Sequence, residues 1–225
     1  MKHLATTLLT LGTLLSPPLA NAQNPLTVVA PAYQAWQHTG TLTILTTPEG
    51  ANLPAAAAVE DFPLLVRLHR DWFDFKQAEA NGADLRFSSS MGAALPYQIE
   101  EWDAANGTAS VWVRIPRIAG NARQSIHVHW GKADAASESS GTAVFNESNG
   151  YVCVMHLGDL ANPVKDEVGA LSPVDAGTTA AAGRIGQGRR FVAQKGINCG
   201  ENITALPTGD NPHSSEAWFR AEAAN

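Results

Sequence analysis

Residues 95–103, LPYQIEEWD, place three carboxylates around a tryptophan. Two acids for proton transfer and an aromatic ring for the sugar face are the groups that a sugar-cleaving enzyme uses. If the stretch is a β-strand, Glu100 and Glu101 point to opposite faces and cannot share a substrate. Glu101 and Asp103 share a face about 6.6 Å apart, but catalytic acids flank a bond from opposed walls. We therefore expect a strand running into a turn.

Five side chains near this stretch are candidate ligand-binding residues. Trp102 and Trp112 are expected on the non-core faces of two neighbouring strands, where indole rings stack on a sugar or simply stabilise the sheet. Arg67, Arg114 and Glu100 are expected on outward faces of the same sheet. Such charges form either a structural ion-pair network or a ligand site, and the structural role is the simpler expectation.

Two histidines raise the possibility of a metal site. His127 and His129 are two residues apart, which places both imidazoles on one face of a strand. Zinc needs a third protein ligand, for which His69, His156 and nearby carboxylates are the candidates. The alternative is a pair of partly exposed surface histidines. No cofactor is expected.

The cysteines and serines give no sign of nucleophilic catalysis. The chain has no Gly-x-Ser-x-Gly motif, and neither of its two cysteines has an evident histidine partner. Cys153 and Cys199 form a disulfide if the protein folds in an oxidising compartment. The alternative is two free buried thiols, and the sequence leaves both open.

The first residues predict export. A short cationic start precedes an apolar stretch, and Ala20 and Ala22 form a small-x-small cleavage site. The apolar stretch is too short to span a membrane, so residues 1–22 read as a secretory signal peptide. No later segment has the length or apolarity of a membrane-spanning helix. We expect an exported protein.

Composition and charge narrow the class further. Charged residues make up 16% of the chain, which contains 19 glycines and 13 prolines. These values suit a turn-rich β protein. The formal net charge is −6 and there are no basic runs, so nucleic-acid binding is not expected.

Alternating apolar and polar residues predict the strands that position the candidates. Residues 41–46, 62–69, 109–116 and 125–130 alternate with period two, as half-buried antiparallel strands do. Val66 and Val113 are expected to point inward, whereas Arg67 points outward. An Asn-Gly pair between two of the runs predicts a hairpin over residues 95–116. A short helix is expected over residues 75–81.

The remaining sequence predicts a second part. Residues 132–142 lack an apolar period and read as a linker or long loop. Further strands are expected within residues 144–157, 186–192, 202–206 and 215–221. The expected organisation is a signal peptide over 1–22, a β-sandwich domain over 23–140, and an incomplete β-sandwich domain over 143–225.

Motifs in this order resemble the bacterial domain-of-unknown-function family numbered 2341 over about residues 35–140. They include Trp36, Phe62-Pro-Leu-Leu-Val-Arg-Leu68, Gly82-Ala-Asp-Leu-Arg-Phe87, the 95–103 stretch, Val111-Trp-Val-Arg-Ile-Pro116 and Trp130-Gly131. The following residues resemble the start of a concanavalin A-like (laminin-G-like) lectin domain. The same pairing occurs ahead of MotA/TolQ/ExbB-type proton-channel segments in envelope proteins.

The resemblance implies architecture and location more than chemistry. It implies an all-β protein, an antiparallel β-sandwich followed by a partial concanavalin-like jelly-roll sheet, in the periplasm or on the surface of a bacterium. We expect a non-enzymatic binding or scaffolding module, either the periplasmic part of a MotA/TolQ/ExbB-type assembly or a glycan-binding surface protein. The alternative is a hydrolase or lyase acting on polysaccharide, with its groove in the lectin-like part.

Overall fold

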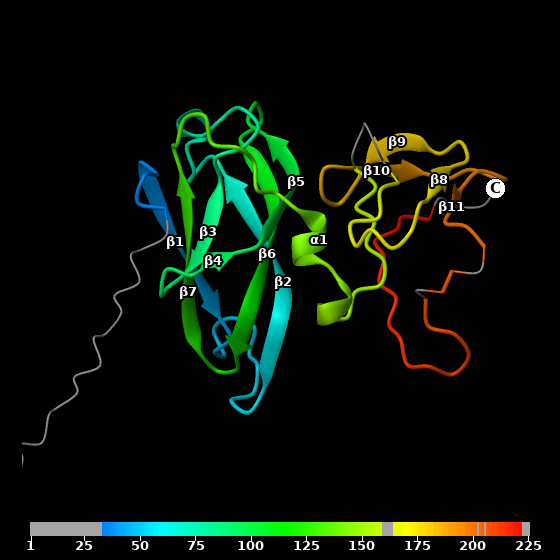
Figure 1. Cartoon of the computed structure of the whole chain (residues 1–225), viewed down its shortest axis with the longest axis horizontal. Coiled ribbons are helices and arrows are strands. Elements are labelled where there is room, and N and C mark those ends of the chain that lie inside the picture. The colour runs from blue at the N-terminus through cyan, green and yellow to red at the C-terminus, as the bar shows by residue number, and fades with distance from the viewer. Residues whose placement is uncertain (1–32, 159–163, 202, 205, 222–225) are drawn as a thin grey trace, which may run out of the picture.

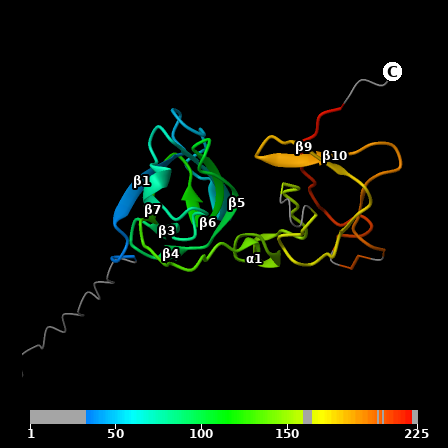
Figure 2. The same cartoon turned by 90° about the horizontal axis from the view of Figure 1, so that it is seen from above.

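The computed structural model describes residues 33–158, 164–201, 203–204 and 206–221 (Figure 1). The predicted signal peptide lies outside these residues. Within them, no helix has both the length and the apolarity needed to cross a lipid bilayer. Two parts lie side by side in the views of Figures 1 and 2, with α1 (Gly141–Val144) between them.

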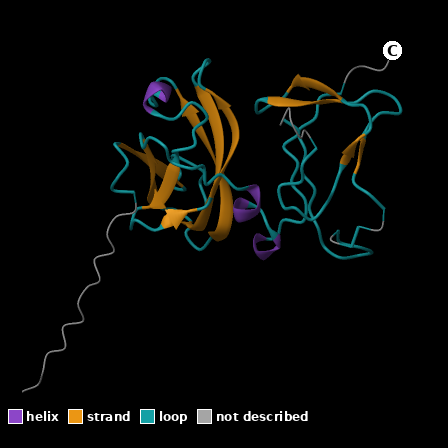
Figure 3. Cartoon of the chain, turned by 45° about the horizontal axis from the view of Figure 1, so that its top comes forward, coloured by secondary structure: helices purple, strands orange, loops and turns teal. Residues whose placement is uncertain are grey.

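The first part is an antiparallel β-sandwich, as predicted. One sheet has the strand order β1-β7-β3-β4, and the other has the order β2-β6-β5. Figure 3 shows the two sheets as facing layers. The strands are β1 (His38–Leu45), β2 (Ala58–His69), β3 (Arg86–Ser89), β4 (Ala94–Leu95), β5 (Tyr97–Asp103), β6 (Thr108–Ala119) and β7 (Arg123–Trp130).

The core lies between the sheets and follows the predicted register. Val66 and Val113 are 7% and 0% exposed, whereas Arg67 faces outward. Aromatic and aliphatic side chains from both sheets and from the loops between them complete the core, and within a strand every second residue points to the same face. The largest fully buried of these side chains include Phe73, Phe87, Leu68 and Leu85.

The predicted hairpin is confirmed as β5 and β6, joined by a turn. Asp103 begins the turn, and its carboxylate accepts hydrogen bonds from the backbone and side-chain nitrogens of Asn106. Gly107 follows with a φ of +68°, a conformation that favours glycine. The predicted helix is shorter than expected: only η1 (Phe75–Gln77), a 3-10 turn, forms there.

Residues 132–142 were predicted as a linker or long loop, and the structure shows a loop that is bonded closely to the sandwich. The backbone nitrogen of Ser140 donates to the carbonyl of Tyr97 at 2.9 Å, and the backbone nitrogen of Ile99 donates to Ser139 Oγ at 2.9 Å. Buried Arg86 donates to the carbonyl of Ala136 at 2.6 Å. The segment is therefore part of the sandwich's surface, since its own polar groups supply the contacts that an apolar period would otherwise provide.

The second part contains little regular structure. Its described residues form two two-stranded antiparallel sheets, β8 (Val174–Asp175) with β11 (Ile197–Asn198) and β9 (Thr179–Ala182) with β10 (Gln187–Arg190). The expected strand near residue 187 is present, but residues 151–157 and 215–221 form no strand. Trp218 and Phe219 are 79% and 87% exposed. An apolar run alone does not make a strand where no neighbouring strand pairs with it.

Candidate functional site

Part of the outer face of the β2-β6-β5 sheet contacts the second part of the chain. The Trp112 ring on β6 lies 5.5 Å from the ring of Phe145 and 6.1 Å from that of His156. Nearby, Arg67 Nη2 donates to the carbonyl of Arg184 at 3.4 Å. We call this contact surface, where Phe145, His156 and Arg184 meet the outer face of the sheet, the seam.

A β-bulge in β5 decides which side chains reach the seam. Ile99 pairs with Val111 and Glu101 pairs with Ser110, so Glu100 is left without a partner on β6. Since one extra residue reverses the alternation beyond it, Glu101 shares the outer face with Ser110. Glu100 also reaches this face, where its carboxylate accepts a hydrogen bond from Trp112 Nε1 at 2.6 Å. The prediction that the two glutamates point to opposite faces is wrong.

The same bulge turns Trp102 inward. Trp102 pairs with Ala109, a core residue, and its ring lies 6.0 Å from Phe73 and 5.1 Å from Phe75. Gly82 leaves room for this ring, because a Cβ there would lie 2.7 Å from it. The prediction that Trp102 faces away from the core is therefore wrong. The two tryptophans do not form a pair, and Trp102 packs against the hydrophobic core.

Glu100 and His156 meet at the seam. His156 Nε2 lies 3.1 Å from Gln98 Oε1, and its Nδ1 lies 3.4 Å from Glu100 Oε2. Because an amide oxygen only accepts, Nε2 carries the imidazole hydrogen in this arrangement. Nδ1 then presents a lone pair to Glu100. The imidazole plane is inclined by only 13° to the Trp112 ring, so the indole fixes its orientation.

Burial sets the protonation of this pair. The Glu100 and His156 side chains are 8% and 13% exposed. Burial, reinforced by the charges of Glu101 and Glu167 and opposed by the Trp112 hydrogen bond, raises the pKa of Glu100 to about 7. Burial and the nearby Lys165 lower the pKa of His156 to about 4. Both shifts favour the neutral forms, with the proton on Glu100.

A pocket of about 440 Å³ opens beside this pair. The bulged strand supplies one wall, and residues 139–142 and 165–167 supply the others. Glu167 is buried, and its carboxylate accepts from Lys165 Nζ at 2.7 Å. The side chains that matter most in the lining are Gln98, Glu100, Thr142, His156, Lys165 and Glu167. All of them are polar, so the pocket is equipped to bind a polar molecule.

Sequence reasoning identified Glu100 but missed most of the pocket. Gln98 lies on the stretch first singled out, and a bulge was detectable there. Ile99 and Trp102 are both apolar and enclose two consecutive acids, so an uninterrupted strand would have buried Glu101 in the core. His156 was considered only as a third metal ligand. Lys165 and Glu167 lie outside every predicted strand and have no motif that marks them.

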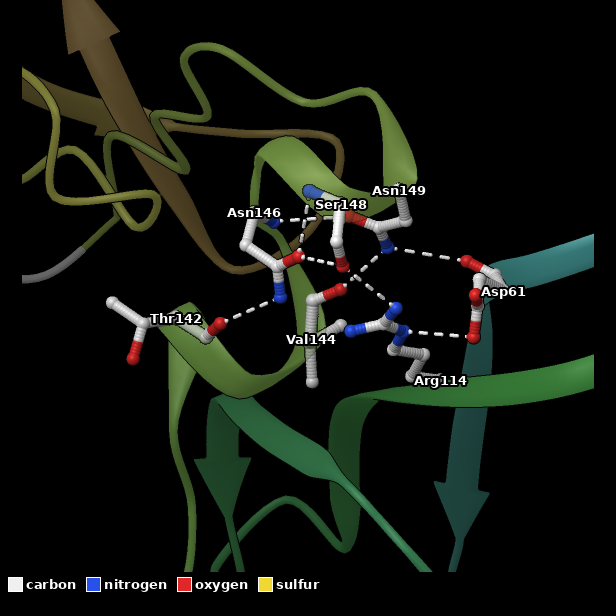
Figure 4. Close-up of polar contacts among 7 residues, drawn as sticks. All are labelled: Asp61, Arg114, Thr142, Val144, Asn146, Ser148 and Asn149. Carbon is white, nitrogen blue, oxygen red and sulfur yellow. Dashed lines mark hydrogen bonds and ion pairs between the residues drawn. The ribbon is translucent and has the colours of Figure 1, made fainter.

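Arg114, a candidate ligand-binding residue, is used in structural contacts (Figure 4). Its Nε lies 3.1 Å from Asp61 Oδ1 on β2, and its Nη2 donates to Ser148 Oγ at 3.1 Å. Ser148 belongs to η2 (Glu147–Asn149). Asn149 adds a hydrogen bond to the carbonyl of Asp61 at 3.1 Å. Arg114 thus joins two strands to the segment that follows α1.

Arg67 lies at the other end of the seam. It lines a second pocket of about 310 Å³ together with Glu101, Ser110 and the 184–186 loop. Arg67, Ser110 and Glu101 form one cross-strand row on the outer face. Arg67 itself is exposed, and its guanidinium donates only at 3.4 Å to Arg184. Of the five candidate ligand-binding residues, Glu100 lines the first pocket, and Trp112 contacts Glu100 through a hydrogen bond.

The two histidines proposed for zinc lie on β7 with their rings 6.3 Å apart. His129 uses both nitrogens, with Nε2 2.8 Å from Ser88 Oγ and Nδ1 3.1 Å from Thr39 Oγ1. Burial, together with His127, lowers the pKa of His129. Among the described residues there is no group of three or more side chains that could hold a metal.

Cys153 and Cys199 are both free and partly buried in the structure. Burial, together with Asp166 and Cys199, raises the pKa of Cys153 to about 11. Its thiol is therefore protonated at neutral pH and is a weak nucleophile. Whether the two pair under oxidising conditions stays a prediction.

Residues 81–151 match the model of a family described as a domain of unknown function (DUF2341). The resemblance to this family is thereby confirmed, whereas the concanavalin A-like and MotA/TolQ/ExbB-type resemblances stay predictions. The matched region continues beyond residue 140 through α1 and η2, and η2 contains Ser148, which accepts a hydrogen bond from Arg114. No curated protein and no solved structure matches the chain.

Proposed function

We propose that this chain, with its DUF2341 segment, is a non-enzymatic extracytoplasmic binding module of a bacterial envelope. The observation that carries the proposal is the pocket at the seam. Its walls come from both parts of the chain and present amide, hydroxyl, carboxyl, imidazole and ammonium groups. Binding sites of this kind are concave and largely preformed.

The docking of the second part makes this site a rigid one. Trp112 and Arg114 hold residues 145–156 against the sheet through stacking and hydrogen bonds. The sandwich therefore acts as a scaffold, and the second part completes the walls of the pocket. A glycan of the envelope is the ligand class that we favour, because polar, hydrogen-bonding pockets suit hydroxyl-rich molecules. Attachment to a MotA/TolQ/ExbB-type assembly is the alternative setting for the same scaffold.

Export and binding can be tested together on the full chain. Expressed in a bacterium, the protein should appear in the periplasmic or surface fraction, shortened by its first 22 residues. The purified protein should co-sediment with insoluble envelope glycan. Arg114→Gln should weaken this binding, because it releases the contact with Ser148. Arg117→Gln is the matched control, since Arg117 pairs with Glu60 on the surface. Equal binding by both variants would show that the docked arrangement is irrelevant to the ligand.

One observation favours a second candidate, a hydrolase of polysaccharides. Glu100 and Glu167 reach the same pocket from different elements, and Glu100, with a pKa of about 7, suits a general acid. The two candidates differ in turnover. Incubation of the purified chain with envelope glycan should release no reducing ends if it is a binding module. Release that disappears in Glu100→Gln would establish the enzyme instead.

A further inference from the structure

The walls of the pocket hold hydrogen-bonding groups that the protein itself leaves unused. Gln98 is 6% exposed, and its amide oxygen is engaged by His156. Its amide nitrogen donates to no group within the described part of the chain. A buried amide that aligns its oxygen on one partner also fixes the direction of its nitrogen. Gln98 therefore offers two directed N–H bonds to an acceptor in the pocket.

Hydroxyl groups line the part of the pocket formed by residues 139–142. Ser139 Oγ accepts from the backbone nitrogen of Ile99 at 2.9 Å, which leaves its own hydrogen to donate. Thr142 Oγ1 lies 3.2 Å from Ser140 Oγ, and one of these two oxygens donates to the other. Each hydroxyl can donate as well as accept. The lining thus contains both donors and acceptors.

The charges in the pocket nearly cancel. Lys165 and Glu167 form an ion pair at 2.7 Å. Glu100 is largely protonated below neutral pH because its pKa is raised to about 7, and His156 stays neutral because its pKa is lowered to about 4. A charged ligand would lose its hydration without finding a free counter-charge. A neutral ligand suffers no such penalty.

We propose that the pocket between β5, residues 139–142 and residues 165–167 binds a neutral, hydroxyl-rich ring, such as one unit of a sugar chain. A hydroxyl both donates and accepts, so a ring that carries several can satisfy the Gln98 nitrogen, the Thr142 hydroxyl and the Glu167 carboxylate together. The volume of about 440 Å³ is within the roughly 300–1,000 Å³ of small-molecule sites. This inference rests on the proposed function and names the ligand class of its pocket.

The test compares three ligands of one shape and different charge. D-Glucose, D-glucosamine and D-glucuronate are titrated at pH 6 into the full chain, and binding is followed by ligand-observed NMR. We expect glucose to bind and the cationic and anionic sugars to bind at least tenfold more weakly. Thr142→Val, which keeps the shape and removes one hydroxyl, should weaken glucose binding about fivefold, the value of one hydrogen bond.

Thr43→Val is the matched control, because Thr43 is exposed on β1 in the other sheet. It should leave glucose binding unchanged. Tighter binding of glucosamine or glucuronate, or glucose binding that Thr142→Val does not alter, would overturn the inference. Failure of all three sugars while the chain still co-sediments with envelope glycan would also overturn it and leave the proposed function standing. If the chain neither binds the sugars nor co-sediments with envelope glycan, the proposed function itself is wrong.

Discussion

Glu100 Oε2 and His156 Nδ1 lie 3.4 Å apart in a buried contact, and a single proton on Glu100 makes this contact favourable. With the imidazole hydrogen directed at Gln98, an ionised Glu100 would place negative charge against a nitrogen lone pair. Protonated Glu100 removes this repulsion. Docking of the second part on the sheet therefore moves a proton from one residue to the other. When the second part is separated from the sheet, His156 is the more basic group and holds the proton. When it is docked, buried Glu100 holds the proton.

The two pKa shifts have opposite consequences for stability. Glu100, raised from 4.5 to about 7, favours docking at low pH and loses that contribution as the pH rises through about 7. His156, lowered from 6.5 to about 4, favours docking at high pH and loses that contribution as the pH falls through about 4. Between pH 4.5 and 6.5, the docked and separated states each hold one proton, on different residues, so no net proton is taken up.

The first prediction is that the docking free energy reaches a plateau as a function of pH. Amide hydrogen exchange in residues 151–158 should report a docking free energy that is constant between pH 4.5 and 6.5, after correction for the intrinsic rate. Above this range the free energy should fall, because the docked state alone retains the proton. A docking free energy that changes steadily with pH across this range would mean that docking does not move a proton from His156 to Glu100.

The second prediction separates the two partners. In Glu100→Gln the amide mimics the protonated acid, so only His156 titrates. Docking should weaken as the pH falls from 6.5 toward 4, by at most about 1.4 kcal/mol per pH unit. His156→Gln leaves Glu100 alone, and docking should then weaken as the pH rises from 4.5 to 7, the opposite direction.

The same exchange measurement applies to both variants, with Arg117→Gln as the control for general effects. A His156 tautomer with hydrogen on Nδ1, identified by nitrogen NMR at pH 6, would contradict the arrangement directly. Slopes of the same sign in both variants would contradict it as well.

The third prediction distinguishes the two tryptophans at the β5–β6 hairpin. Trp102→Ala should lower the free energy of unfolding of the sandwich by about 2–4 kcal/mol, because it empties a site beside Phe73 and Phe75. Trp112→Ala should leave the sandwich folded and release the second part. Thermal melts measure the first effect, and proteolysis within residues 150–190 measures the second. Identical effects in both variants would show the bulge register to be wrong.

The fourth prediction concerns where the sandwich ends. A version of the chain covering residues 23–151 should melt several degrees higher than one covering 23–140. The longer version retains Ser148 and Asn149, which bond to Arg114 and Asp61. It also covers Trp112 with Phe145. Melts at equal protein concentration test this, and equal midpoints would mean that α1 and η2 add nothing to the sandwich.

The sandwich could be predicted from the sequence because its strands alternate strictly. Val66 and Val113 lie in the core as the period-two pattern requires. The bulge at Glu100 was not predicted, because the alternation of inward and outward residues was assumed to continue through the two consecutive acids Glu100 and Glu101. Half of the pocket could not be predicted at all. His156 and Glu167 reach Glu100 only through long-range packing of an irregular loop, and no local pattern encodes such a contact.

The segment beside β5 has a consequence for the behaviour of the protein at high concentration. β5 is an edge strand of its sheet, and edge strands recruit strands from other molecules. Here the backbone nitrogen of Ser140 donates to the carbonyl of Tyr97, and Ser139 Oγ accepts from the backbone nitrogen of Ile99. The bulge at Glu100 interrupts the ladder of hydrogen bonds beyond them. A foreign strand finds no continuous row of free donors and acceptors along β5. The serine-rich segment that resembled a spacer therefore protects the protein from polymerising through this edge.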